Sequence, residues 1–242
     1  MIRLIKGPVQ SILKTFNYRV VYSPRHQITG INFVDDLKLL VRNERPVCFD
    51  VGANEGQTIE LFRGIFENPR IYAFEPSSQA FRKLLSQGHG PQVSLHNFAL
   101  GQRNGEEEFI NYENSCLSSF LPLDANKDNP FRALKVKNKE AVDVRTIDWF
   151  ARENQITKID LLKIDTQGYD LQVLKGAGDS FQNGLIDNVF IELNFVKLYE
   201  DQSGPNQITD FLAERNIHLV DYYEKVRQNH RLAWCTALYS KH

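Results

Sequence analysis

The residues with the clearest chemical potential form a glycine-containing loop that directly follows a short apolar run. The apolar run is Val47–Val51, and the loop reads Asp50-Val51-Gly52-Ala53-Asn54-Glu55-Gly56-Gln57-Thr58. Glycines let a ligand approach the backbone closely, and a helix that begins after such a loop presents N–H groups with no partner inside the helix. The pattern predicts a strand, a turn and a helix start that together bind a nucleotide-like ligand.

Two details of this loop favour S-adenosylmethionine (SAM) over a dinucleotide. A dinucleotide fingerprint places its second glycine against the pyrophosphate, but here Asn54 holds that position and Asp50 adds negative charge nearby. SAM carries an ammonium, which suits an acid at a strand end, and a carboxylate, which suits N–H groups at a helix start. We therefore expect SAM contacts from five loop residues: Asp50, Gly52, Asn54, Gly56 and Thr58.

A second acid follows the next apolar run, in the sequence Phe74-Glu75-Pro76. Glu75 lies nineteen residues after Gly56, close to the offset of ~20 residues at which an acid holds ribose hydroxyls in nucleotide-binding folds. A carboxylate can accept hydrogen bonds from both hydroxyls at once. We expect Glu75 and Pro76 to border the ribose, and Ala99, a small residue after the third apolar run, to leave room for adenine.

Strands and helices alternate along most of the chain. Apolar runs predict strands at Val47–Val51, Arg70–Phe74, Val93–Phe98, Ile159–Ile164 and Asn188–Leu193, and helical periodicity predicts helices near 33–40, 57–66, 77–86, 146–154, 170–176 and 208–215. The hydroxyls of Ser77 or Ser78 and of Thr146 are placed to cap two of these helices. Such alternation gives a parallel sheet with helices on both faces. The last two runs, Ile217–Tyr223 and Ala233–Tyr239, have only a polar turn at Glu224–Arg231 between them, so they must pair antiparallel. The predicted fold class is α/β: a doubly wound, Rossmann-like, mostly parallel sheet that ends in an antiparallel β-hairpin.

In order and spacing these motifs resemble the FkbM-type methyltransferases, a class I methyltransferase family. The similarity extends from about Val47 to Leu193 and includes the glycine loop, Phe74-Glu75-Pro76, Ala99-Leu100-Gly101, Asn114–Ser119, Val144–Asp148 and Leu161–Asp170. It implies SAM-dependent methylation, with S-adenosylhomocysteine (SAH) as product, usually on a hydroxyl of a sugar, glycan, lipid or polyketide-type acceptor. The chain differs at Gln167, where many members carry Glu, so Gln167 is not assigned as a base.

One acid follows the fourth predicted strand and another lies at the end of the fifth, at the edge where ligands bind in open α/β sheets. An alkyl hydroxyl is barely ionised at neutral pH, so a base that takes its proton assists its attack on the methyl group. We assign Asp165 and Glu192 as catalytic candidates. Asp165 could instead orient SAM. The two acids could also hold a divalent ion through oxygen ligands, although we assign no metal. Ser118, in the polar stretch Asn114–Ser119, is a further candidate SAM contact.

The organisation of the chain and its composition narrow the function further. We expect a methyltransferase domain over residues 46–242 with an excursion at 101–145, preceded by a lead-in at 1–45 that could act as a substrate lid. The net charge is −1, which argues against a broad nucleic-acid surface and favours a small-molecule or glycan acceptor. Three separated cysteines and the lack of an apolar run near ~20 residues favour a cytoplasmic protein with no membrane span. An N-methyltransferase and a SAM-binding protein without turnover remain alternatives.

Overall fold

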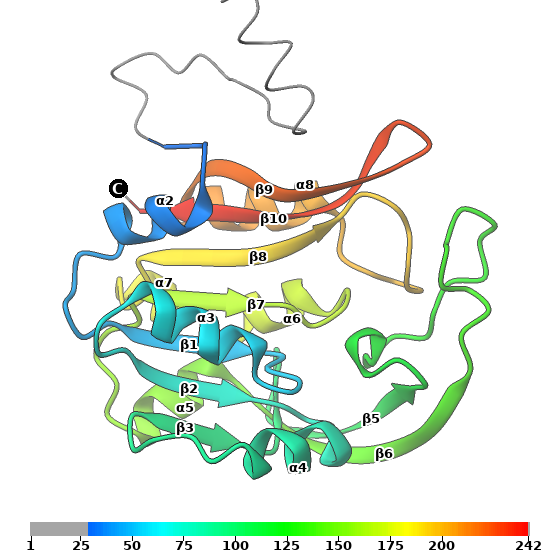
Figure 1. Ribbon diagram of the computed structural model, residues 1–242, viewed down its shortest axis with the longest axis horizontal. Helices are drawn as coiled ribbons and strands as arrows, with labels where there is room; N and C mark the ends of the chain where they lie inside the picture. The colour runs from blue at the N-terminus through cyan, green and yellow to red at the C-terminus, as the bar shows by residue number, and fades with distance from the viewer. Residues whose placement is uncertain (1–28, 242) are drawn as a thin grey trace, which may run out of the picture.

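A seven-stranded sheet forms the centre of the protein in the computed structural model, which describes residues 29–241 (Figure 1). Most of the predicted lead-in therefore lies outside the described residues. The strands are β1 (Val47–Val51), β2 (Arg70–Phe74), β3 (Val93–His96), β7 (Leu161–Ile164), β8 (Asn188–Asn194), β9 (His218–Gln228) and β10 (Arg231–Ser240). Their order is β3-β2-β1-β7-β8-β10-β9. The strands from β3 to β8 are parallel, and β10 runs antiparallel to both β8 and β9, as predicted.

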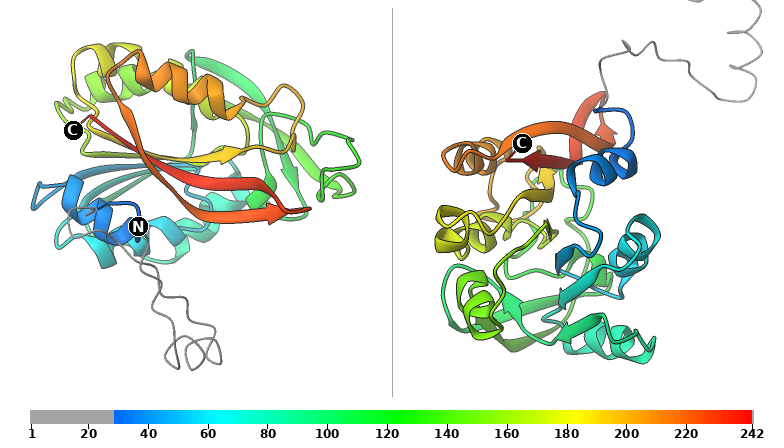
Figure 2. Two further views of the ribbon diagram at one scale, coloured as in Figure 1. Left: turned by 90° about the horizontal axis from the view of Figure 1, so that it is seen from above. Right: turned by 90° about the vertical axis from the view of Figure 1, so that its left-hand side faces the viewer.

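Two layers of helices cover the sheet (Figure 2). One face carries α2 (Phe33–Leu40), α3 (Gln57–Ile65) and α4 (Ser78–Ser86); the other carries α5 (Ile147–Glu153), α6 (Asp170–Lys175), α7 (Gly178–Gln182) and α8 (Pro205–Ala213). Successive side chains of a strand point to opposite faces, so Cys48 of β1 packs in the α3 layer and Phe49 in the α5 layer. Among residues 29–241, no helix has the length and apolar character needed to cross a lipid bilayer.

The chain turns in opposite directions after β1 and after β7. From β1 it continues to β2 and β3 on one side, whereas β7 leads to β8 on the other. A crevice opens outside the carboxyl ends of the strands at such a switch point, and it is the usual ligand site of open α/β sheets. Gly52 follows β1 and Asp165 follows β7, so the topology itself brings these two predicted site residues together.

Several local predictions are confirmed at the residue level. Ser77 caps α4 by accepting the N–H of Ala80, and Thr146 caps α5 by accepting the N–H of Trp149. The predicted polar turn at Glu224–Arg231 is wrong in extent, because β9 and β10 continue until only Asn229 and His230 connect them. Both residues have positive φ, 49° and 65°, as in the tight hairpin turns whose twist matches the strands. Polar side chains in this stretch misled the prediction because β9 is an edge strand.

The excursion forms a second, small sheet beside the carboxyl edge. Its strands are β4 (Ala99–Leu100), β5 (Gly105–Tyr112) and β6 (Val136–Arg145), in the order β4-β6-β5. Within the predicted excursion, β5 and β6 run antiparallel, and a loop with the short helix η1 (Ser115–Leu117) lies between them. Figure 1 shows this sheet extending away from the main one.

A buried polar cluster attaches this small sheet to α4. Glu140 of β6 accepts hydrogen bonds from the backbone N–H and the hydroxyl of Ser78 and from Asn111 Nδ2. Ser77 donates its hydroxyl to Asn111 Oδ1. The first turn of α4 therefore fixes the orientation of β5 and β6, which carry the loop that covers the sheet edge.

We expect Glu140→Ala to detach the small sheet from α4. The change leaves Asn111 and Ser78 without an acceptor, so it should lower the free energy of unfolding by about 1–3 kcal/mol and speed amide hydrogen exchange in β5 and β6. The matched control is Glu108→Ala, which removes an exposed pair with Lys139 and should cost less than about 1 kcal/mol. Equal effects of the two changes, measured by urea denaturation, would contradict this account.

Candidate functional site

A cavity of about 330 Å³ opens at the carboxyl ends of β1, β2 and β7. Eight of the residues predicted from the sequence line it: Gly52, Asn54, Thr58, Glu75, Pro76, Ala99, Ser118 and Asp165. Three predicted residues do not line it: Asp50, Gly56 and Glu192. The loop after β1, the end of β2, the excursion and the turn after β7 therefore meet around one space.

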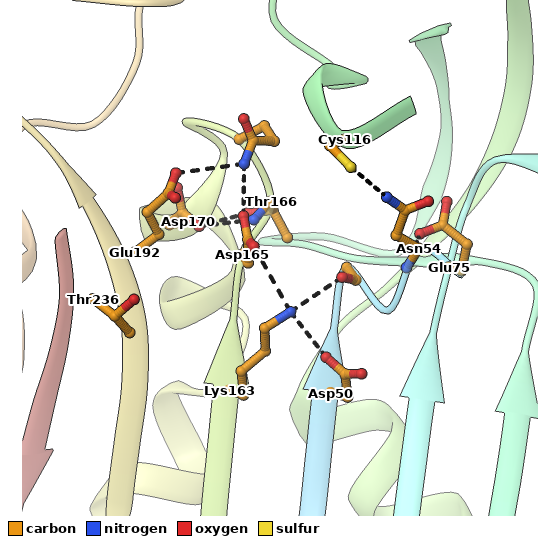
Figure 3. A network of polar contacts seen from close by, with 12 residues as sticks. Asp50, Asn54, Glu75, Cys116, Lys163, Asp165, Thr166, Asp170, Glu192 and Thr236 are labelled. Atoms are coloured by element: carbon orange, nitrogen blue, oxygen red, sulfur yellow. Dashed lines mark hydrogen bonds and ion pairs between the residues drawn. The ribbon is translucent and has the colours of Figure 1, made fainter. Parts of the chain in front are cut away.

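A buried ion pair lies beneath this cavity (Figure 3). Lys163 Nζ is 3.0 Å from Asp50 Oδ1 and donates a hydrogen bond of 3.2 Å to the carbonyl oxygen of Gly52. It is also 4.0 Å from Asp165 Oδ2. Asp50 and Lys163 lie opposite each other in the register of β1 and β7, so the sheet fixes this ion pair.

Asp50 therefore differs from its predicted place, because its side chain has no exposed surface and faces Lys163 instead of the cavity. Burial raises the pKa of Asp50, and the ammonium of Lys163 opposes that shift. Burial also disfavours the Lys163 ammonium, but the carboxylates of Asp50 and Asp165 outweigh it and raise the pKa of Lys163. The sequence analysis missed Lys163; a single lysine in the apolar run Leu161–Ile164 was the available signal, since buried lysines need a partner.

The two glycines of the loop have different structural roles. Gly52 has a φ of +83°, and a Cβ there would lie 2.0 Å from the carbonyl oxygen of Asp165. Gly56 has a φ of +96° and precedes α3, where a Cβ would meet Leu84 of α4 at 2.8 Å. Gly52 thus permits the close approach of the turns after β1 and β7, and Gly56 permits α3 to pack on α4.

Glu75 is held at the side of the cavity by two backbone donors. Its Oε2 accepts the N–H of Asn54 and its Oε1 accepts the N–H of Ser77, both at 2.8 Å. Each carboxylate oxygen can accept a second hydrogen bond, so the group can still bind a pair of ligand hydroxyls. Burial raises the pKa of Glu75 to about 7, against the effect of the two N–H donors.

A glutamine connects the two predicted catalytic acids. Gln167 Nε2 donates to Asp165 Oδ1 at 2.7 Å and to Glu192 Oε1 at 3.4 Å. The Asp165 side chain is 38% exposed, whereas burial, followed by the charges of Asp165 and Asp170, raises the pKa of Glu192 to about 8. Asp165 and Glu192 thus lie near one another as predicted (Figure 3), but of the two only Asp165 lines the cavity.

The turn that carries Gln167 is shaped by Asp170, which the sequence analysis also missed. Asp170 Oδ1 accepts the N–H and the hydroxyl of Thr166, and Oδ2 accepts the N–H of Gly168, all at 3.0 Å. Gln167 and Gly168 have positive φ values of 54° and 90°. Burial raises the pKa of Asp170 to about 6. This buried carboxylate therefore holds the strained turn that presents Gln167 to the two acids.

The excursion covers the cavity near the turn that carries Gln167. Ser118 lines the cavity and its hydroxyl accepts the N–H of Tyr112 at 3.2 Å. Ser119 donates its hydroxyl to the carbonyl oxygen of Gln167 at 2.8 Å. Tyr199, in the segment after β8, contacts the carbonyl oxygen of Leu117 at 2.9 Å through its hydroxyl. Among residues 29–241, no group of three or more His, Cys, Asp or Glu side chains is arranged to hold a metal ion.

His96 at the end of β3 lies in an aromatic cluster outside the cavity. Its ring centroid is 5.2 Å from that of Phe74 and 4.8 Å from that of Phe150. Burial lowers the pKa of His96. A neutral imidazole packed among rings has a structural role here, by supporting the end of β2 that carries Glu75.

Comparison with known proteins places this geometry in a family. A sequence model described as a methyltransferase FkbM domain matches residues 50–219. The 2-O-methyltransferase NoeI of Sinorhizobium fredii is 24% identical over 181 residues, which cover 72% of this chain and 73% of that protein. The hexuronic acid methyltransferase AglP of Haloferax volcanii is 26% identical over 192 residues, which cover 76% of this chain and 69% of that protein.

A solved structure supports the fold assignment. The crystal structure of a methyltransferase FkbM from Methylobacillus flagellatus superposes with a TM-score of 0.52 and 17% sequence identity. The match covers 81% of this chain but only 44% of that one, so the chain spans less than half the length of the solved protein. At this identity the similarity concerns the Rossmann-like arrangement of the sheet and helices.

We expect Lys163→Met to destabilise the protein strongly. The change leaves the buried Asp50 carboxylate without its cation, and breaking a buried pair in this way costs about 3–5 kcal/mol. The double variant Asp50→Asn/Lys163→Met should recover more than half of the loss, because it removes the uncompensated charge. Lys139→Met, at an exposed pair, is the control; urea denaturation that showed the same small effect for both lysines would contradict the role of Lys163.

Proposed function

The chain belongs to the FkbM methyltransferase family, whose cofactor is SAM, and from this premise we propose that it methylates a hydroxyl of a sugar or glycan. The observation that carries the proposal is the Asp165 carboxylate, which lines the cavity directly after β7 and is partly exposed. A base at this place is what a hydroxyl acceptor needs.

The residues around the cavity suit SAM in size and in chemistry. A volume of about 330 Å³ falls within the range of about 300–1,000 Å³ that is typical of small-molecule sites. Glu75 would hold the ribose hydroxyls, and Phe74, Ala99 and Leu100 offer apolar surface for adenine. The N-cap residue of α3, Gly56, supplies no side-chain cap, so the N–H groups in the first turn of α3, beside Thr58, would receive the SAM carboxylate.

When bound, SAM supplies a methyl group on a sulfonium, which makes that carbon electrophilic. The protein's part is to place the acceptor hydroxyl in line with the methyl group and to remove its proton. We assign the proton transfer to the Asp165 carboxylate, since Glu192 does not reach the cavity and Gln167 cannot accept a proton at neutral pH. Holding the reacting groups in line supplies a further part of the acceleration.

The choice of a sugar-like hydroxyl is supported by two kinds of observation. The relatives NoeI and AglP are named as a 2-O-methyltransferase and a hexuronic acid methyltransferase. The corner beside Asp165 carries the amide of Gln167 and the hydroxyl of Ser118, groups that pair with hydroxyls. The near-neutral charge of −1 favours such an acceptor over a nucleic acid.

We expect Glu75→Ala to weaken SAH binding by about 1–3 kcal/mol, or roughly five- to 150-fold in Kd, because hydrogen bonds to a charged acceptor are lost. Isothermal titration calorimetry on the folded protein measures it directly. The control is Glu107→Ala, which alters a carboxylate outside the cavity. Unchanged affinity in Glu75→Ala would contradict the assignment of the ribose site.

The affinity for SAH should also depend on pH. Glu75 must be ionised to accept hydrogen bonds from both hydroxyls strongly, and burial raises its pKa to about 7. Below that value, binding requires the loss of a proton, so affinity should fall as pH falls, approaching about tenfold per pH unit. The dependence should be absent from Glu75→Gln, whose amide does not titrate. A profile that is flat from about pH 7 to pH 5 in the wild-type protein would count against this role of Glu75.

We expect Asp165→Asn to lower kcat on a hydroxyl acceptor by about 10²–10⁴-fold, the usual contribution of a general base. SAH affinity should change far less, which separates loss of the base from loss of the cofactor site. The assay is transfer of a labelled methyl group from SAM to a panel of glycans and uronic acids. Unchanged turnover in Asp165→Asn would favour an amine acceptor, and SAH binding without any methylated product would favour a binding protein.

A further inference from the structure

The side-chain amide of Gln167 is fixed at both ends. Its nitrogen faces Asp165 Oδ1 at 2.7 Å and Glu192 Oε1 at 3.4 Å, and its oxygen lies 2.9 Å from the Tyr199 hydroxyl. The Asp165 carboxylate accepts hydrogen bonds, so the amide nitrogen must face it, and the amide oxygen then faces the Tyr199 hydroxyl, whose single proton is shared with the carbonyl oxygen of Leu117 at 2.9 Å. Tyr199 is fully buried, and burial raises the pKa of its hydroxyl, so it remains a donor.

The surroundings of this amide contain more acids than bases. Asp165 and Glu192 contact it, Asp170 lies beneath the same turn, and Asp50 lies below on β1, whereas Lys163 is the nearest cation. Asn194 on β8 donates to the same oxygen of Glu192 at 3.1 Å. A donor without charge between the two carboxyl groups therefore keeps them close and adds no further negative charge.

The two hydrogen bonds from the amide are unequal in a way that matches the two acids. The shorter bond goes to Asp165, which is the partly exposed acid, and the longer bond goes to Glu192, whose pKa is about 8 because it is buried near other carboxylates. A short bond from an amide suits an ionised acceptor.

We propose that Gln167 is a positioning residue, held by Tyr199, whose amide nitrogen occupies one oxygen of Asp165 and leaves the other free to take the proton of the acceptor hydroxyl. This inference rests on the proposed function, since it assumes that Asp165 is the base. Gln167 itself transfers no proton. Tyr199 acts one step further away, by fixing the orientation of the amide.

The first experiment is the pH dependence of kcat for Gln167→Glu, a change that keeps the shape of the side chain but replaces the donor with a third carboxylate. The acid limb of the profile should move to higher pH by about one unit or more, the usual effect of a close like charge. The double variant Gln167→Glu/Glu192→Gln restores the number of carboxyl groups but keeps one against Asp165, so the limb should stay at higher pH; a return to the wild-type position would mean that only the number of carboxyl groups matters and would overturn the positioning role. Gln102→Glu, at an exposed glutamine, controls for the added charge and should leave the profile unchanged.

Tyr199→Phe tests the second contact without adding charge. It removes the hydroxyl that holds the amide oxygen, so kcat should fall by about tenfold or more, as when a reacting group is slightly displaced, while KM for SAM stays the same. A loss of thermal stability with an unchanged kcat would mean that Tyr199 is merely structural and would overturn its part in the proposal.

A second readout does not require turnover. In protein labelled with ¹³C at the glutamate carboxyl carbons, the resonance missing from Glu192→Gln identifies Glu192, and its midpoint is followed from acid to alkaline pH. The midpoint should rise in Gln167→Glu and stay in place in Gln102→Glu. An unchanged midpoint in Gln167→Glu would overturn the positioning role. A raised midpoint in a protein that methylates no hydroxyl acceptor would support the positioning and overturn the proposed function alone.

Discussion

The ion pair between Lys163 and Asp50 is the interaction on which the site depends. A buried charge is tolerated only with a partner, and here the partner comes from the neighbouring strand of a parallel sheet. Because the same ammonium donates to the carbonyl of Gly52 and lies 4.0 Å from Asp165, one cation joins the turns after β1 and β7. The position of the cofactor loop and that of the base are therefore set together.

The acidic residues above this ion pair differ in burial and in hydrogen bonding. Glu75 is buried and Glu192 is half-buried; burial raises their pKa values to about 7 and about 8, with nearby carboxylates adding to the shift of Glu192. Asp165 is more exposed and receives a short hydrogen bond from Gln167. Side chains of one chemical type can thus serve binding, support and proton transfer, because their burial and their hydrogen-bond partners differ.

The sequence was sufficient for the parts of the fold that follow from local patterns. β1 and β2 match their predicted bounds, and the caps Ser77 and Thr146 are in place, because apolar runs, glycines and hydroxyls act over a few residues. The role of Asp50 could not be predicted in this way, since its partner is 113 residues away in the chain. Only the register of two strands, a property of the whole sheet, decides whether that carboxylate faces a ligand or a lysine.

The role of Gln167 also could not be predicted from local sequence. As a replacement for an acid it was not assigned as a base, because a sequence motif records which group is present but not what surrounds it. In the structure its nitrogen lies between two carboxyl groups and its oxygen beside a hydroxyl, so the amide donates to both carboxyl groups, which a carboxylate would repel, and still accepts from the hydroxyl. An amide there is the residue that this particular environment requires, since the surrounding charge is already negative. The negative charge of Asp165 and Glu192 therefore explains why a neutral amide fits at position 167.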